Sequence, residues 1–140
     1  KCTSQLMRDL TLGLENSVIL CGTCADMADK YTQYSLHLMT SRYEGQGIVL
    51  IEAQAAGLPS VVFDYEYGAA DIVTDGVNGF LVPQNDTKTF TNRLVQIMDS
   101  ENLRAKFGTE AKENVKTFFT ENIMWKWEEF IKKTTNKQNR

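Results

Sequence analysis

Short apolar runs alternate with longer helical patterns along most of the chain. Four of these runs have the length of buried β-strands, and glycine, proline or polar residues bound them. They are residues 18–21, 36–39, 60–63 and 79–82. Residues 26–33 and 48–56 have helical patterns, and residues 67–74 suit a short helix or turn. Strands that alternate with helices predict a Rossmann-like α/β fold, in which helices flank a parallel sheet.

The pattern becomes continuously helical after Pro83. Asp86 has the side chain of an N-cap, and three helices are expected beyond it: residues 87–98, 101–119 and 121–133. We assign residues 1–133 to one domain and residues 134–140 to a basic tail. Residues 132–140 hold four Lys or Arg and no Asp or Glu. A solvated tail is the simpler interpretation, and weak peripheral contact with an anionic membrane surface is the alternative.

Composition narrows the classes of function. The chain has 15 Lys and Arg against 18 Asp and Glu, a net charge of −3, which argues against a nucleic-acid partner. Its single histidine and three cysteines show no zinc-ligand spacing, so we expect no metal site. The sequence has no apolar run of about 18 residues and no signal-peptide pattern. Three cysteines are also few for a secreted disulfide scaffold, so we expect a cytoplasmic protein.

The most informative segment is the loop that runs into the helix expected at residues 48–56. Its two glycines, Gly45 and Gly47, let the backbone adopt positive φ angles and let a ligand approach closely. The first turn of a helix presents unpaired N–H groups and a partial positive charge. The N–H groups of Gly47, Ile48 and Val49 are therefore candidate donors to an anion.

Two glutamates flank this helix start. The helix is apolar apart from Glu52 and Gln54, so we expect it to be buried, where a carboxylate is unfavourable unless it is bonded or faces a ligand. Glu52 lies roughly 7–8 Å along the axis from Gly47, and Glu44 precedes the helix. Carboxylates on both sides of an anion would accept hydrogen bonds from hydroxyls attached to it, as in a sugar nucleotide. Two simpler explanations stay open: the helix dipole favours Glu44, and an Arg or Lys pairs with Glu52.

This segment resembles the E-x7-E motif of the GT4-type (group 1) retaining glycosyltransferases, which have the GT-B fold. Glu44 and Glu52 have the motif's spacing, and YEGQGIVLIEAQAAGLP at residues 43–59 is similar to the family's EGFGLVLLEAMACGLPVV. YGAADIVTDGVNGFLVP at residues 67–83 resembles the family's D…G…EII.DG.NGFLV segment, and residues 18–22 resemble its V-x-F-x-G strand. The resemblance covers nearly the whole chain and implies a partial C-terminal half of a GT-B fold.

The resemblance implies transfer of a hexose-type sugar from a UDP- or GDP-sugar to an acceptor hydroxyl, with retained anomeric configuration. The acceptor would be a glycan or a lipid-linked glycan in surface polysaccharide or glycolipid synthesis. That role would place the protein in the cytoplasm, at the inner face of the membrane. The family implies no metal, and no cofactor beyond the nucleotide-sugar substrate.

The family's site residues carry over to matching positions of this sequence. Glu52 would bind the ribose hydroxyls of the nucleotide. Glu44, the catalytic residue of this assignment, would bind the donor sugar and orient it. The N–H groups at the helix start would hold the distal phosphate or the sugar. The full donor-binding set implied by the resemblance is Glu44, Gly45, Gln46, Gly47, Ile48, Val49 and Glu52.

The sequence also departs from the family. Gln46 stands where the family frequently has Phe, and Gln54 where it frequently has Met. The chain resembles only the later part of the C-terminal domain, so we expect an N-terminal, acceptor-binding domain as its partner and an inactive isolated chain. The strand at residues 18–21 would be separated from the strand at residues 36–39 by two strands that the chain does not hold. We expect either that the strand at residues 18–21 pairs elsewhere or that another chain, such as a second copy in an oligomer, fills that gap.

Two other functions remain as alternatives. The first is a thioredoxin-like disulfide oxidoreductase, in which Cys21 and Cys24 form a C-x-x-C motif after a strand and Pro59 takes the place of that fold's cis-proline. The second is a non-catalytic module that binds a nucleotide sugar.

A few further residues are weaker candidates for the site. We expect a structural role for His37. Asp64 and Asp71 suit caps or turns, although the carboxyl ends of parallel strands are where ligands bind. Tyr65 and Tyr67 are expected as loop aromatics that face the acceptor or the other domain.

Overall fold

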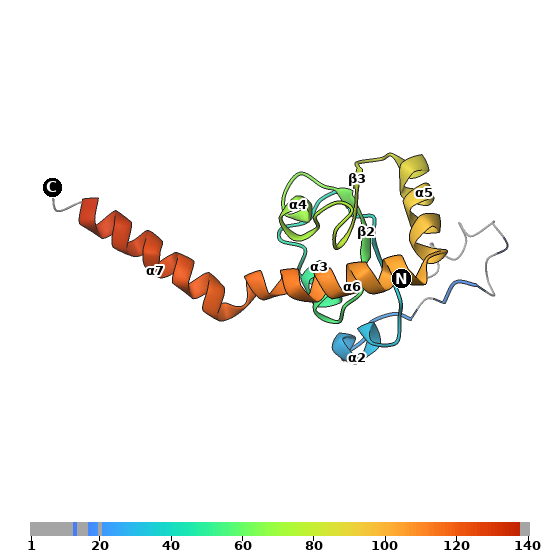
Figure 1. Ribbon diagram of the computed structural model, residues 1–140, viewed down its shortest axis with the longest axis horizontal. Helices are drawn as coiled ribbons and strands as arrows, with labels where there is room; N and C mark the ends of the chain where they lie inside the picture. Colours follow the sequence, from blue (N-terminus) through green and yellow to red (C-terminus); the bar gives the residue numbers. More distant parts are fainter. Residues whose placement is uncertain (1–12, 14–16, 20, 138–140) are drawn as a thin grey trace.

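A computed structural model describes residues 13, 17–19 and 21–137 of the chain. Helices and strands alternate through the first part, and helices alone make up the rest (Figure 1). In chain order they are α2 (Met27–Tyr31), β1 (His37–Met39), α3 (Ile48–Ala55), β2 (Ser60–Asp64), α4 (Ala69–Ile72), β3 (Gly79–Pro83), α5 (Thr87–Met98), α6 (Glu101–Val115), the 3-10 helix η1 (Lys116–Phe118) and α7 (Thr120–Lys137). The expected N-cap is confirmed, because the Asp86 side chain accepts a hydrogen bond of 2.9 Å from the Thr89 N–H.

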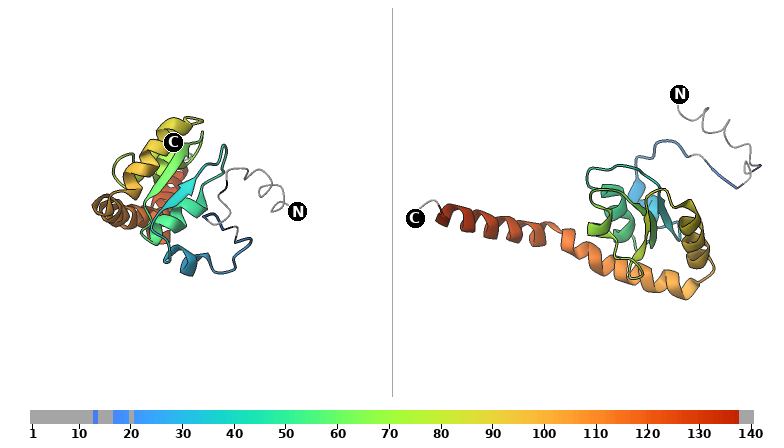
Figure 2. Two further views of the ribbon diagram at one scale, coloured as in Figure 1. Left: turned by 90° about the vertical axis from the view of Figure 1, so that its right-hand side faces the viewer. Right: turned by 90° about the horizontal axis from the view of Figure 1, so that it is seen from above.

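The three strands form one parallel sheet in the order β1-β2-β3, with Ser60 paired to both His37 and Gly79. Helices cover both faces, as the two views of Figure 2 show. Apolar side chains of β2 alternate between them, because successive residues of a strand point to opposite faces. Val62 packs with Leu50 of α3 on one face, and Val61 packs with Phe90 and Ile97 of α5 on the other. The predicted Rossmann-like parallel sheet flanked by helices is confirmed.

The strand expected at residues 18–21 does not form at its described positions, Val18, Ile19 and Cys21; Leu20 lies outside the described residues. Ile19 is 83% exposed. An apolar run becomes a strand only beside a partner strand, and the described part of the chain offers none at that place. Strand β1 therefore pairs with β2 alone and has a free edge among the described residues. A second chain at that edge stays a prediction.

The expectation that α3 is buried on all sides is wrong. Leu50, Ala53 and Gln54 are buried against the sheet and α6, but Ile48 and Val49 are 61% and 48% exposed. A helix packed on one face buries only the side chains of that face. The described residues supply no second layer above α3.

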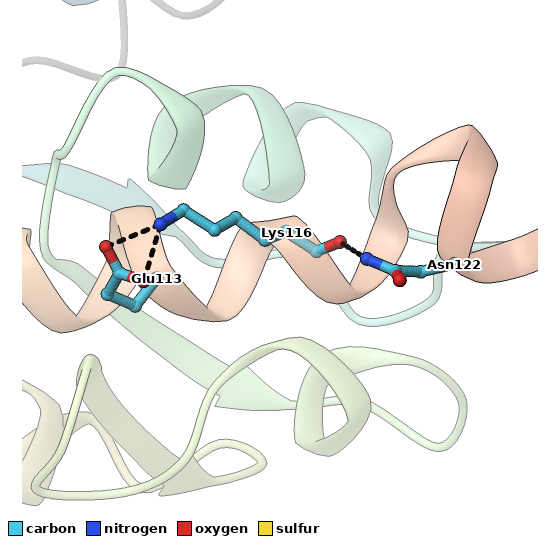
Figure 3. Close-up of polar contacts among 3 residues, drawn as sticks. All are labelled: Glu113, Lys116 and Asn122. Atoms are coloured by element: carbon cyan, nitrogen blue, oxygen red, sulfur yellow. Dashed lines mark hydrogen bonds and ion pairs between the residues drawn. The ribbon is translucent and has the colours of Figure 1, made fainter.

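Helix α7 extends away from the body of the molecule (Figures 1 and 2). It follows η1 and the extended Phe119 (φ −66°, ψ 148°), which ends the preceding helical run. Figure 3 shows this junction, where Lys116 pairs with Glu113 at 2.6 Å and the Asn122 Nδ2 donates to the Lys116 carbonyl. The helix continues to Lys137 and so includes residues 134–137, which the sequence pattern assigns to the basic tail. Within residues 13, 17–19 and 21–137, no helix combines the length and apolarity needed to cross a bilayer.

A buried polar network ties α3 to the other elements. The Ile72 carbonyl accepts hydrogen bonds from three side-chain amides, those of Gln54, Asn78 and Asn114, at 3.1, 3.0 and 2.8 Å. The Asn78 Oδ1 in turn accepts from the Thr74 N–H at 2.8 Å. Gln54 and Asn78 are almost completely buried. Gln54, which departs from the family's Met, thus links the site helix to α4 and α6.

Substitution of Asn78 by alanine is expected to lower the free energy of unfolding by about 2 kcal/mol, because the Thr74 N–H and the Gln54 Oε1 each lose a partner. Urea denaturation followed by far-UV circular dichroism measures the change. The control is Asn92→Ala, at an exposed position of α5, which should be close to neutral. Equal stabilities of the two variants would contradict the role of the network.

Candidate functional site

The loops at the carboxyl edge of the sheet carry the expected site. The loop between β1 and α3 is held in place by the Gln84 Nε2, which donates to the Arg42 carbonyl at 3.0 Å and to the Ser41 carbonyl at 3.4 Å. Within the loop, the Ser41 Oγ donates to the Glu44 Oε1 at 2.7 Å. Glu44 is half-buried, and the hydrogen bond from Ser41 holds its carboxylate within the loop.

The start of α3 has the features of an anion site. Gly47 is the N-cap, in the left-handed conformation (φ 64°, ψ 42°), and no side chain caps the helix. The Gly47 carbonyl accepts from the N–H groups of Leu50 and Ile51. The N–H groups of Ile48 and Val49 precede any intrahelical acceptor and so remain available to a ligand. Gly45 is exposed, and a Cβ there would meet nothing within 4 Å.

Tyr65 lies directly beneath this helix start. A Cβ at position 47 would overlap the Tyr65 Oη, so the close packing requires glycine there. Tyr65 is 2% exposed, which corrects the expectation that it faces the acceptor or another domain. Its Oη has no hydrogen-bond partner among the described residues, and burial together with the charge of Glu44 raises its pKa. Tyr67, by contrast, is exposed, and its hydroxyl donates to Glu66 at 3.0 Å.

Glu52 lies on the exposed face of α3 and lines a groove of about 650 Å³ between α3 and α2. Met27, Tyr31 and Ala55 also line this groove. The Tyr31 Oη lies 3.5 Å from the Glu52 Oε2. No Lys or Arg among the described residues forms an ion pair with Glu52, so the paired-cation explanation receives no support.

The structure does not bring every expected site residue into one hollow. Gln46 lines a separate hollow of about 330 Å³ with Ile51, Phe118 and Met124, at the base of α7. Glu44 lines neither hollow. Tyr31 could not be identified from the sequence as a neighbour of Glu52, because the two residues are 21 positions apart and belong to different helices. The described residues contain no group of three or more His, Cys, Asp or Glu placed to hold a metal ion.

His37 has the surroundings of a structural residue. Its Nδ1 lies 3.3 Å from the Ser60 Oγ, and its ring is nearly perpendicular to the Tyr31 ring. Burial lowers the pKa of the imidazole, which favours the neutral form at pH 7. His37 thus contributes packing against Tyr31 rather than a charge in the groove.

Comparison with known proteins decides the family. Residues 6–114 match the family model of glycosyl transferases group 1. The chain belongs to the group 1 glycosyltransferases. The poly(ribitol-phosphate) alpha-N-acetylglucosaminyltransferase of Staphylococcus aureus (strain COL) is 35% identical over 115 residues, which are 81% of this chain and 23% of the relative. The amylovoran biosynthesis glycosyltransferase AmsD of Erwinia amylovora is 35% identical over 118 residues, 84% of this chain and 33% of that protein.

A solved structure has the same fold as this group 1 chain. It is that of a variant of TarM from S. aureus in complex with Fondaparinux, alpha-GlcNAc-glycerol and UDP. Its TM-score to this chain is 0.81 at 33% sequence identity, over 89% of this chain and 25% of the TarM chain. The group 1 chain therefore spans about a quarter of the TarM chain, and the predicted partial GT-B fold is confirmed.

The thioredoxin-like alternative receives no support. Cys21 and Cys24 are free, and Cys21 is exposed in a segment without helix or strand. A redox C-x-x-C motif needs the rigid strand and helix that flank it in a thioredoxin fold. The group 1 chain lacks that strand at the described positions before Cys21.

Proposed function

We propose that this chain supplies the donor-binding part of a retaining glycosyltransferase, which transfers a hexose-type sugar from a nucleotide sugar to an acceptor hydroxyl. The observation that carries the proposal is the start of α3, which no side chain caps, with Glu44 before it and Glu52 beside a groove after it. The spacing of these two glutamates is that of the family's E-x7-E motif. Family membership supports glycosyl transfer over a module that only binds the nucleotide sugar.

Each part of the site has a task in this proposal. The nucleoside lies in the groove between α2 and α3, where the Glu52 carboxylate accepts hydrogen bonds from the ribose hydroxyls. The distal phosphate lies at the start of α3 and accepts hydrogen bonds from the N–H groups of Ile48 and Val49. Glu44 exchanges its hydrogen bond from Ser41 for hydroxyls of the donor sugar, and Gly45 and Gln46 border that sugar.

Catalysis then depends on position and charge rather than on a protein nucleophile. The N–H groups and the helix dipole stabilise the negative charge that develops on the leaving phosphate. Glu44 orients the donor sugar so that the acceptor hydroxyl approaches on the face that the leaving group departs from, which retains the anomeric configuration. The leaving phosphate helps to deprotonate that hydroxyl. Holding both reactants in this geometry supplies much of the rate enhancement.

We infer UDP rather than GDP as the nucleotide, because the similar TarM structure contains UDP. The acceptor in this proposal is a glycan or a lipid-linked glycan, bound by an N-terminal GT-B domain that works with this chain. The named relatives act on poly(ribitol-phosphate) and in amylovoran biosynthesis, which supports polysaccharide synthesis. The free, exposed Cys21 suits a reducing compartment such as the cytoplasm.

Calorimetric titration of the chain with UDP, GDP and uridine tests the proposal. We expect UDP to bind more tightly than GDP. We also expect UDP to bind about tenfold or more tightly than uridine, because charge-assisted hydrogen bonds at the helix start require the phosphates. If uridine binds as tightly as UDP, the start of α3 holds no phosphate. If none of the three binds, either to this chain or to a longer protein in which it is joined to its N-terminal domain, the proposed function is wrong.

A further inference from the structure

Tyr31, the last residue of α2, packs against α3 and is fixed there by its neighbours. The side chain is 5% exposed and packs with Ala53 and Leu58 in a small apolar cluster. The His37 ring meets it at 6.4 Å between centroids and 79° between planes. Because the ring is fixed on several sides, its hydroxyl has a defined position relative to α3.

The Tyr31 hydroxyl reaches two acceptors on α3. Its Oη lies 3.5 Å from the Glu52 Oε2 and 3.4 Å from the Val49 carbonyl oxygen. Both distances are long for a hydroxyl donor, which has one hydrogen to share between two acceptors. A tyrosine hydroxyl is protonated at neutral pH, and burial, followed by the negative charge of Glu52, raises the pKa of Tyr31 further. It therefore stays a donor beside the carboxylate.

The position of the Glu52 carboxylate depends on its contact with the Tyr31 hydroxyl. Its side chain is exposed, and the Tyr31 Oη is the hydrogen-bond donor recorded for its carboxylate among the described residues. A free glutamate side chain samples several rotamers, and fixing them on binding reduces affinity. A rigid donor at Oε2 limits these rotamers, and Oε1, which has no hydrogen bond within the described residues, stays available to a ligand in the groove that Glu52 and Tyr31 line.

We propose that Tyr31 is a positioning residue, whose hydroxyl orients the Glu52 carboxylate to accept hydrogen bonds from the ribose of the nucleotide donor. This inference rests on the proposed function, because it requires a ribose at Glu52. Tyr31 acts through Glu52 and does not touch the reacting atoms. Its effect belongs to nucleotide affinity and depends on the ribose hydroxyls.

Titration of the 140-residue chain with UDP tests the inference. Tyr31→Phe keeps the ring and removes the donor, so we expect UDP to bind roughly fivefold more weakly, the size of one hydrogen bond. The matched control is Tyr34→Phe, at an exposed tyrosine whose hydroxyl has no hydrogen bond recorded among the described residues, and UDP affinity should not change. Thermal unfolding checks that both variants are folded.

Two further titrations separate a positioning role from a structural one. A UDP analogue that lacks the two ribose hydroxyls should bind wild type and Tyr31→Phe with equal affinity. In a Glu52→Ala background, Tyr31→Phe should cause no further loss of UDP affinity, because the residue through which Tyr31 acts is gone. Equal losses for UDP and the analogue, or additive losses in the double variant, would overturn the inference.

A spectroscopic measurement covers the case in which Tyr31→Phe lowers stability. The side-chain carboxyl carbon of Glu52, followed by NMR in the nucleotide-free chain, should shift in Tyr31→Phe and not in Tyr34→Phe. An unchanged Glu52 signal in both variants would contradict the contact itself. UDP binding by wild type, in contrast, tests the proposed function, so the two failures are distinguishable.

Discussion

Replacement of Glu52 by glutamine is expected to weaken UDP binding about 30-fold (~2 kcal/mol), the largest effect on affinity that the site predicts. The substitution keeps the length of the side chain and removes the charge, so hydrogen bonds from the ribose hydroxyls lose a charged acceptor. Stability should change little, since Glu52 lies on the exposed face of α3 and pairs with no cation among the described residues. Calorimetric titration with UDP measures the loss.

The matched control for this experiment is Glu110→Gln, which removes one negative charge from an exposed position of α6. It changes the net charge of the chain by the same amount and lies outside the groove. An equal loss of affinity in both variants would show that net charge, rather than the Glu52 carboxylate, governs binding. Unchanged affinity in Glu52→Gln would remove the ribose-binding role of this residue.

Replacement of Gly47 by alanine is expected to lower the free energy of unfolding by about 3 kcal/mol. Part of the loss comes from the left-handed backbone at Gly47, and part from the overlap between the new Cβ and the Tyr65 Oη. Relief of that overlap displaces the start of α3, so UDP affinity should fall as well. Chemical denaturation and calorimetry measure the two effects separately.

Two related variants divide the loss between its causes. Gly45→Ala meets no neighbouring atom within 4 Å and should be close to neutral. In Gly47→Ala/Tyr65→Phe the overlap is absent, and the remaining loss should be about 1 kcal/mol, the cost of a non-glycine residue in this conformation. Tyr65→Phe alone should be tolerated, because the buried hydroxyl has no partner among the described residues. A double variant as unstable as Gly47→Ala would exclude Tyr65 as the obstacle.

The parallel sheet and the start of α3 could be predicted because local sequence determines them. Short apolar runs separated by helical patterns specify β1, β2 and β3, and Gly47 specifies the turn into α3. The Asp86 cap and the break near residue 119 likewise depend on a few neighbouring residues. The match of residues 6–114 to the group 1 model confirms the family that the motif spacing indicated.

Features that depend on distant neighbours could not be predicted. Residues 18–21 have the composition of a strand, but strand formation requires a partner that the described residues do not provide. The sequence pattern of α3 identifies its apolar positions, but it does not show which of them are covered by another element and become buried. Tyr65 occurs between exposed residues, so its burial beneath Gly47 becomes visible only in three dimensions. The contact of Tyr31 with Glu52 is likewise a product of tertiary packing.

The extension of α7 determines what intrinsic fluorescence can report. Both tryptophans of the chain, Trp125 and Trp127, lie in this helix and are 63% and 57% exposed. Their emission therefore senses the surroundings of α7, whereas the sheet and the groove contain tyrosine and phenylalanine. A change in tryptophan emission on mixing with another protein would mark contact at α7, and nucleotide binding in the groove would leave it unchanged. Tryptophan emission is therefore insensitive to the nucleotide donor and selective for a protein that contacts α7.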